Sequence, residues 1–164
     1  KEYFVLPETL YTPTPKIRAT ADPSRKISKS AGAKHYINEV EEEKRVRQQI
    51  GSAVTDTGEQ DTAEMSPGVA NLFELLKAAE NLEAHDALME SYRSNTLPYK
   101  DLKQVVADTL VEITEQFRAN RAEINANKKE VKSKIKASSA TIRKITQETL
   151  KEVKDLAGLL NVRF

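Results

Sequence analysis

Apolar residues recur along most of this chain at the spacing of amphipathic helices, in which positions i, i+3, i+4 and i+7 share one face. The pattern begins near Glu39, and acidic residues at 41–43 suit the first turns of a helix because the helix macrodipole favours negative charge there. Thr-Asp-Thr-Gly at 55–58 predicts the end of this helix, and residues 58–64 have the polar character of an exposed loop. The first apolar stripe consists of Val46, Ile50, Ala53 and Val54.

Two shorter helices are predicted next. Ser66 is a good N-cap and Pro67 suits the first helical position, so a helix should begin there. A further short helix should end at Ser-Asn-Thr-Leu-Pro, residues 94–98. The apolar positions of these two helices are Val69, Leu72, Phe73 and Leu76, and then Leu82, Leu88 and Tyr92.

The longest apolar stripes lie in the last third of the chain. One helix is predicted from about Tyr99 to Asn125, and a second follows a weak break at 125–127 and ends near Gly158. Small residues at 138–140 interrupt the last stripe and would permit close approach of a neighbouring helix. Five amphipathic helices with short links predict a mainly α fold, a helical bundle. The stripes contain Leu102, Val106, Leu110, Ile113, Phe117 and Ile124, and then Val131, Ile135, Ile142, Ile145, Val153 and Leu160.

The first 25 residues do not have a helical pattern. Pro7, Pro13, Pro15 and Pro23 each remove a backbone donor and move the preceding residue out of the α region. An extended connector is therefore predicted, followed by a turn at Asp-Pro-Ser-Arg, residues 22–25. This segment cannot bury a core by itself, and we expect it to pack against another part of the protein.

Composition excludes several classes of protein. The absence of cysteine excludes disulfide frameworks, thiolate metal sites and cysteine nucleophiles, and two histidines cannot form a His-rich metal site, so we expect no metal site. No apolar run approaches the ~18 residues that span a membrane. The chain begins with Lys1 and shows no signal-peptide pattern, which predicts a piece of a longer protein.

Charge is balanced in total, at +1, but not along the chain. Residues 1–36 carry a net charge of +4, residues 37–86 carry −8, and residues 128–154 carry +6. Phosphate contacts are therefore expected at the two ends rather than in the middle.

The chemically informative stretch is Lys-Ile-Ser-Lys-Ser at 26–30. Two lysines separated by two residues, with hydroxyl groups beside them, form a compact set of donors for a polyphosphate. A solvated surface turn is the alternative, since clusters of lysine and serine are common. The position of the cluster, after a proline-rich segment and before a helical region, favours a functional loop.

These five residues resemble the KMSKS signature of class I aminoacyl-tRNA synthetases, with Ile27 in place of the commoner methionine. Ala-Val-Thr-Asp-Thr-Gly at 53–58 and Pro-Gly-Val-Ala-Asn-Leu at 67–72 are similar to stretches of the bacterial-type tryptophanyl-tRNA synthetase family. The two long C-terminal helices also fit that family. The resemblance covers essentially the whole chain.

The resemblance implies two parts, with residues 1–36 as the end of a Rossmann-type catalytic domain and residues 37–164 as an α-helical anticodon-binding domain. It implies ATP and Mg²⁺ as cofactors, with Lys26, Ile27, Ser28, Lys29 and Ser30 at the ATP. Lys26 and Lys29 would stabilise the pyrophosphate leaving group and Ser28 would donate a hydroxyl to it. The partners implied are tRNA(Trp) and tryptophan, in a cytoplasmic parent enzyme that is a homodimer.

Contacts to tRNA are expected on the helical part. A basic solvent-exposed face is the alternative explanation for the lysines and arginines of the last helix, and core packing is the expected role of Phe117. The candidate tRNA contacts are Asp56, Arg118, Arg121, Lys128, Lys132 and Arg143.

The chain also departs from the family. Its other signature, His-Ile-Gly-His, is missing, and neither His35 nor His85 belongs to a His-x-x-His pair. The chain by itself is therefore predicted to be inactive. We also expect it to be a monomer. Two alternatives remain, a fragment of the sister tyrosyl enzyme and a non-enzymatic helical interaction module. The stretch at 67–72 argues against the tyrosyl enzyme.

Overall fold

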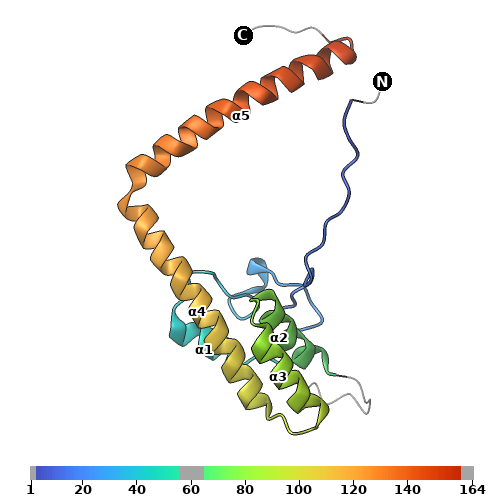
Figure 1. Cartoon of the computed structure of the whole chain (residues 1–164), viewed down its shortest axis with the longest axis vertical. Coiled ribbons are helices and arrows are strands. Elements are labelled where there is room, and N and C mark those ends of the chain that lie inside the picture. Colours follow the sequence, from blue (N-terminus) through green and yellow to red (C-terminus); the bar gives the residue numbers. More distant parts are fainter. Residues whose placement is uncertain (1–2, 56–64, 160–164) are drawn as a thin grey trace. The chain divides into compact units, whose positions relative to one another are not determined.

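The computed structural model describes residues 3–55 and 65–159 of the 164-residue chain (Figure 1). Contacts divide it into two compact units, which are described separately. The helical unit comprises the described part of residues 10–120, and the α5 unit comprises the described part of residues 1–9 and 121–164. Among the described residues, the α-helices are α1 (Glu43–Gly51), α2 (Pro67–Ala78), α3 (Leu82–Arg93), α4 (Tyr99–Ala126) and α5 (Lys128–Leu156). The predicted mainly α fold class is confirmed.

The core of the helical unit lies between α1, α2 and α4. Burial of each large aliphatic side chain contributes about 1.5–3 kcal/mol, so this cluster is the main source of stability. Helix α3 packs onto α2, where the ring of Phe73 meets that of Tyr92 edge to face at 6.1 Å. The largest fully buried side chains are Val46, Ile50, Val69, Leu72, Leu76, Leu102 and Val106.

Side-chain caps fix where α2 and α3 begin. Ser66 caps α2 by accepting a hydrogen bond from the backbone N–H of Val69 at 3.4 Å, with Pro67 in the first turn. Asn81 caps α3 through the N–H of Ala84 at 3.2 Å, and its amide also donates to the Thr109 hydroxyl of α4 at 2.8 Å. The predicted start of α2 is therefore confirmed, whereas the cap of α3 at Asn81 had not been predicted.

The first helix is shorter than predicted at both ends. The Asn38 backbone carbonyl accepts the Glu41 N–H at 3.0 Å, which forms a turn, and the helix begins only at Glu43. At the other end it stops at Gly51, because the Val54 N–H donates to the Thr20 carbonyl at 3.0 Å instead of to a helical carbonyl. Ala53 is still buried, so its apolar character reflects core packing outside the helix.

Polar contacts join α1 to α4. Arg47 of α1 pairs with Asp108 of α4, and the guanidinium holds the pKa of that carboxyl below its usual value. Lys103 donates to the Gly51 carbonyl at 3.2 Å, which satisfies an orphan carbonyl at the end of α1. These contacts fix α1 beside α4.

The predicted break between the last two helices is confirmed at Asn127, but the apolar stripe around it is not buried. Phe117 is 49% exposed, so the expectation that it packs in the core is wrong. In the α5 unit no described residue of α5 is buried, and Ile135 and Ile142 are 60% and 61% exposed. The periodicity of apolar residues indicates an amphipathic helix, but it does not indicate whether another surface packs against its apolar face.

Candidate functional site

A small hairpin-like arrangement carries the lysine-rich loop. Arg18 and Lys26 form an isolated antiparallel β-bridge, and the Ala19 N–H donates to the Arg25 carbonyl at 3.0 Å. The predicted turn between them is confirmed, since Asp22 accepts hydrogen bonds from the Ser24 hydroxyl at 2.6 Å and the Ser24 N–H at 3.1 Å. Lys26 therefore begins the loop at a defined position.

Asn71 of helix α2 binds the backbone at the base of the hairpin-like arrangement. The side-chain oxygen of Asn71 accepts the Arg18 N–H at 2.8 Å, and its amide nitrogen donates to the Arg18 carbonyl at 3.0 Å. Asn71 is only 5% exposed, and both of its polar groups are satisfied by one backbone residue. The strand before the loop is therefore anchored to the core.

The far end of the loop is anchored by two further side chains. The buried Thr20 donates to the Lys34 carbonyl at 3.0 Å, and the Gln49 amide of α1 donates to the carbonyls of Ala33 and Tyr36. Contacts with α1 and α2 thus hold both ends of the lysine-rich stretch within the helical unit.

The loop itself presents its donors to solvent. Lys26, Lys29 and Ser30 are exposed, Ser28 is half-buried, and the Ser28 and Ser30 hydroxyls lie 2.9 Å apart. Residues Lys29–Ala31 form a single 3₁₀ turn, and the Lys29 ammonium lies 5.8 Å from the centre of the Tyr36 ring. The structure thus brings the motif residues together on one exposed loop.

An open pocket lies beside the base of the loop. It combines apolar side chains with three cations, which is a composition suited to a nucleotide, whose base is apolar on its faces and whose phosphates are charged. The lining residues are Pro15, Lys16, Ile17, Arg18, Lys26 and Ile27.

The turn before the loop is expected to depend on pH through Asp22. The hydroxyl of Ser24, and then its backbone N–H, hold the pKa of the Asp22 carboxyl below its usual value. Because the folded-state pKa is the lower one, the carboxylate stabilises the turn above the ordinary Asp pKa, and this is lost as the pH falls through the lowered pKa. We expect Ser24→Ala to raise the Asp22 pKa in an NMR titration of the carboxyl carbon. Ser28→Ala removes a hydroxyl that faces Ser30 instead, so it should leave the Asp22 pKa unchanged. If the Asp22 pKa in Ser24→Ala equals that of the unaltered chain, this assignment is contradicted.

The expected tRNA-contacting residues fall into three groups. Arg118 is engaged within the helical unit, where its guanidinium donates to the Glu41 carbonyl at 2.9 Å and pairs with Glu42 at 3.1 Å. Asp56 lies outside the described residues. The exposed members, all in the α5 unit, are Arg121, Lys128, Lys132 and Arg143. The structure does not test these contacts, which stay predictions.

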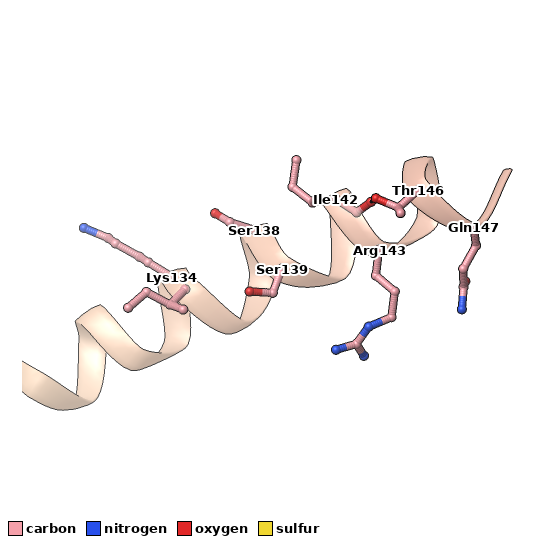
Figure 2. A pocket seen from close by; sticks show the side chains of 8 residues that line it. Lys134, Ser138, Ser139, Ile142, Arg143, Thr146 and Gln147 are labelled. Carbon is pink, nitrogen blue, oxygen red and sulfur yellow. The ribbon is translucent and has the colours of Figure 1, made fainter. Parts of the chain in front are cut away.

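A shallow hollow runs along α5 (Figure 2). All of its lining residues belong to this one helix. The hollow is an open helix face with basic and apolar side chains rather than an enclosing cleft. Its lining includes Lys134, Ile135, Ser138, Ser139, Ile142 and Arg143.

No described group of three or more His, Asp or Glu side chains is arranged to hold a metal ion. The described residues therefore contain no carboxylate cluster that could bind the expected Mg²⁺ directly. None of the helices in the described ranges has the length and apolar character that a membrane span requires.

The sequence patterns missed two residues that organise this site, Asn71 and Arg18. A polar residue within the apolar stripe of α2 was the available signal for Asn71, since a buried amide needs partners. For Arg18 the signal was a cation eight positions before Lys26, with turn residues between them. His85 was also missed as a core residue: it is buried against the Phe73 ring at 5.5 Å.

Comparison with known proteins agrees with the motif. The model of the family described as "tRNA synthetases class I (W and Y)" matches residues 1–115. A tryptophan–tRNA ligase of Streptomyces avermitilis is 31% identical over 166 residues, which covers 97% of this chain and 48% of that protein. The ligase of Wigglesworthia glossinidia brevipalpis is 26% identical and covers 98% and 49%.

A solved structure gives the same match in three dimensions. The tryptophanyl-tRNA synthetase of Mycoplasma pneumoniae superimposes with a TM-score of 0.72 at 26% identity, over 90% of this chain and 46% of that one. The chain thus spans about half the length of the relatives it matches.

Proposed function

Because this chain belongs to the class I tRNA synthetases of the tryptophan and tyrosine family, we propose that it is part of a tryptophan–tRNA ligase. Such an enzyme activates tryptophan with ATP and transfers it to tRNA(Trp). In this proposal residues 1–36 complete the catalytic domain and residues 37–164 form the anticodon-binding domain. The single observation that carries the proposal is the exposed Lys26–Ser30 loop, held at both ends by the helical unit.

The chemistry assigned to the loop is electrostatic. When a tryptophan carboxylate oxygen attacks the α-phosphorus of ATP, the bond between that phosphorus and the oxygen bridging it to the β-phosphorus breaks. Negative charge then grows on the departing pyrophosphate. Lys26 and Lys29 stabilise that charge, and Ser28 donates its hydroxyl to a phosphate oxygen. Donors that act on charge as it develops lower the barrier rather than tighten substrate binding. Magnesium would accompany the nucleotide and neutralise part of the same charge.

Recognition of tRNA is assigned to the helical part, in a cytoplasmic enzyme. The exposed cations of α5 support phosphate contacts, because Lys128, Lys132 and Arg143 all lie on a helix without buried residues. Base recognition by this part would act on splayed anticodon bases rather than on a duplex groove. Arg118 is assigned instead to holding α4 against the start of α1.

The amino acid that the full-length enzyme activates distinguishes this proposal from the tyrosyl alternative. We expect the full-length gene product to exchange pyrophosphate into ATP in the presence of tryptophan, to charge tRNA(Trp), and to do neither with tyrosine. This 164-residue chain alone should not catalyse exchange. Exchange that requires tyrosine would establish the sister activity, and exchange with neither amino acid would refute the proposal. Family membership leaves no support for the third possibility, an unrelated helical interaction module.

A further inference from the structure

Two cations lie directly opposite each other at the base of the loop. Arg18 and Lys26 are paired across an antiparallel bridge, so their side chains project from the same face. Like charges in directly opposite positions destabilise a pair of strands. A partner of opposite charge would therefore stabilise this arrangement.

Neither residue forms an ion pair with a carboxylate in the described part of the chain, although Glu74 lines a neighbouring pocket with Lys16 and Arg18. Within residues 3–55 and 65–159, no salt bridge involves Arg18 or Lys26. The register cannot slip to separate the charges, because Asn71 holds both backbone groups of Arg18. The guanidinium is also positioned, since its Nη1 donates to the Ser24 carbonyl at 3.2 Å. No other hydrogen bond of this guanidinium is formed among the described residues.

A third cation joins this pair. Lys16 precedes Arg18 by two positions and is exposed like it. All three side chains line the open pocket beside the loop, together with Ile17 and Ile27. Only Lys26 of these cations belongs to the motif recognised in the sequence.

We propose that Arg18 is a further phosphate-contacting residue, which shares the polyphosphate of a nucleotide with Lys26. Its planar guanidinium takes two oxygens of one phosphate, while the lysine ammonium acts as a point charge on the next. The bound polyphosphate also relieves the repulsion between the two cations. This inference rests on the proposed function and deepens it, because it adds a contact to the same site.

Inorganic pyrophosphate is the probe for this site, and its binding to the 164-residue chain is followed by NMR titration at low ionic strength. Arg18→Gln should raise the dissociation constant by about tenfold or more, the effect of one lost charge-assisted hydrogen bond. Arg18→Lys should recover part of that loss because it restores the charge. Arg25→Gln is the matched control, since it removes one positive charge from an exposed neighbour that does not line the pocket.

Folding of the variants is checked by thermal denaturation without pyrophosphate. Arg18→Gln should change the midpoint little, because removal of the like-charge contact offsets loss of the hydrogen bond to the Ser24 carbonyl. A lowered midpoint would mean that Arg18 is a structural residue, and an equal loss of affinity in Arg25→Gln would mean that only total charge matters. Either result overturns the proposal.

Two further arms separate this proposal from neighbouring ones. If Lys26→Gln weakens pyrophosphate binding and Arg18→Gln leaves it within twofold, the Arg18 assignment fails while the proposed function stands. A single-stranded oligoribonucleotide tests the other source of phosphates, an RNA backbone. If Arg18→Gln loses binding of this oligonucleotide but keeps pyrophosphate binding, the nucleotide assignment is overturned. Absence of pyrophosphate binding by the unaltered chain at millimolar concentration also overturns it, whereas the tryptophan-dependent exchange reaction judges the proposed function independently.

Discussion

Replacing Lys29 with alanine in the full-length enzyme is expected to slow formation of tryptophanyl adenylate by about 10²–10³-fold, the cost of removing one donor from a developing charge. The affinity for tryptophan should change little, because in the proposed function the Lys29 ammonium acts on the phosphates and not on the amino acid. The loss should therefore fall on the rate constant rather than on the Michaelis constant for tryptophan. Tryptophan-dependent pyrophosphate exchange measures both quantities.

Lys34→Ala provides the matched control for this experiment. Lys34 is an exposed lysine at the end of the same stretch, and only its backbone carbonyl takes part in the anchoring contact with Thr20. Its side chain can be removed without loss of that contact, and exchange should stay close to the wild-type rate. An exchange rate within threefold of wild type for Lys29→Ala would remove the proposed role from Lys29.

The second large effect is expected at Gly68, in the first turn of α2. A Cβ atom added there would lie 2.0 Å from the Val54 carbonyl oxygen and 2.7 Å from its carbon, so backbone must move. Helix propensity favours alanine over glycine by up to about 1 kcal/mol, but overpacking costs about 1–3 kcal/mol and more when the obstacle is backbone. We therefore expect Gly68→Ala to lower the free energy of unfolding by about 2 kcal/mol or more.

Gly51 offers the matched control, because it also lies in a helix but a Cβ there meets no atom within 4 Å. Gly51→Ala should leave stability unchanged or raise it by up to about 1 kcal/mol. Urea denaturation of the 164-residue chain, followed by circular dichroism, compares the two variants. Similar midpoints for both would show that α2 can shift away from Val54 without cost.

The contacts of Gly68 and Asn71 explain how α2 supports the loop. Gly68 lets α2 approach the backbone at Val54, and the N–H of Val54 in turn holds the Thr20 carbonyl. One turn further along α2, the Asn71 side chain hydrogen-bonds to the backbone of Arg18. The two contacts together fix the strand before the loop against one helix. A change in the position of α2 would therefore be transmitted to the base of the lysine-rich loop.

Local chemistry in the sequence determined most of the helical framework. Ser66 with Pro67 specified the start of α2, Asp22 with Ser24 specified the turn, and the weak break at Asn127 separated the last two helices. These features depend on neighbouring residues, whose side chains satisfy nearby backbone groups. The loop motif could likewise be recognised from five consecutive residues.

Only the tertiary structure decided which patterns become buried and which residues meet. The first helix ends at Gly51 because Val54 pairs with Thr20, a contact between residues 34 positions apart that no local pattern contains. The stripe of α5 has the periodicity of a core helix, yet burial requires an opposing surface, and no residue of α5 is buried within its own unit. The pairing of Arg18 with Lys26, and its fixation by Asn71, likewise arise from chain packing. Local propensity sets where helices start and turn, but burial and long-range pairing depend on which surfaces the fold brings together.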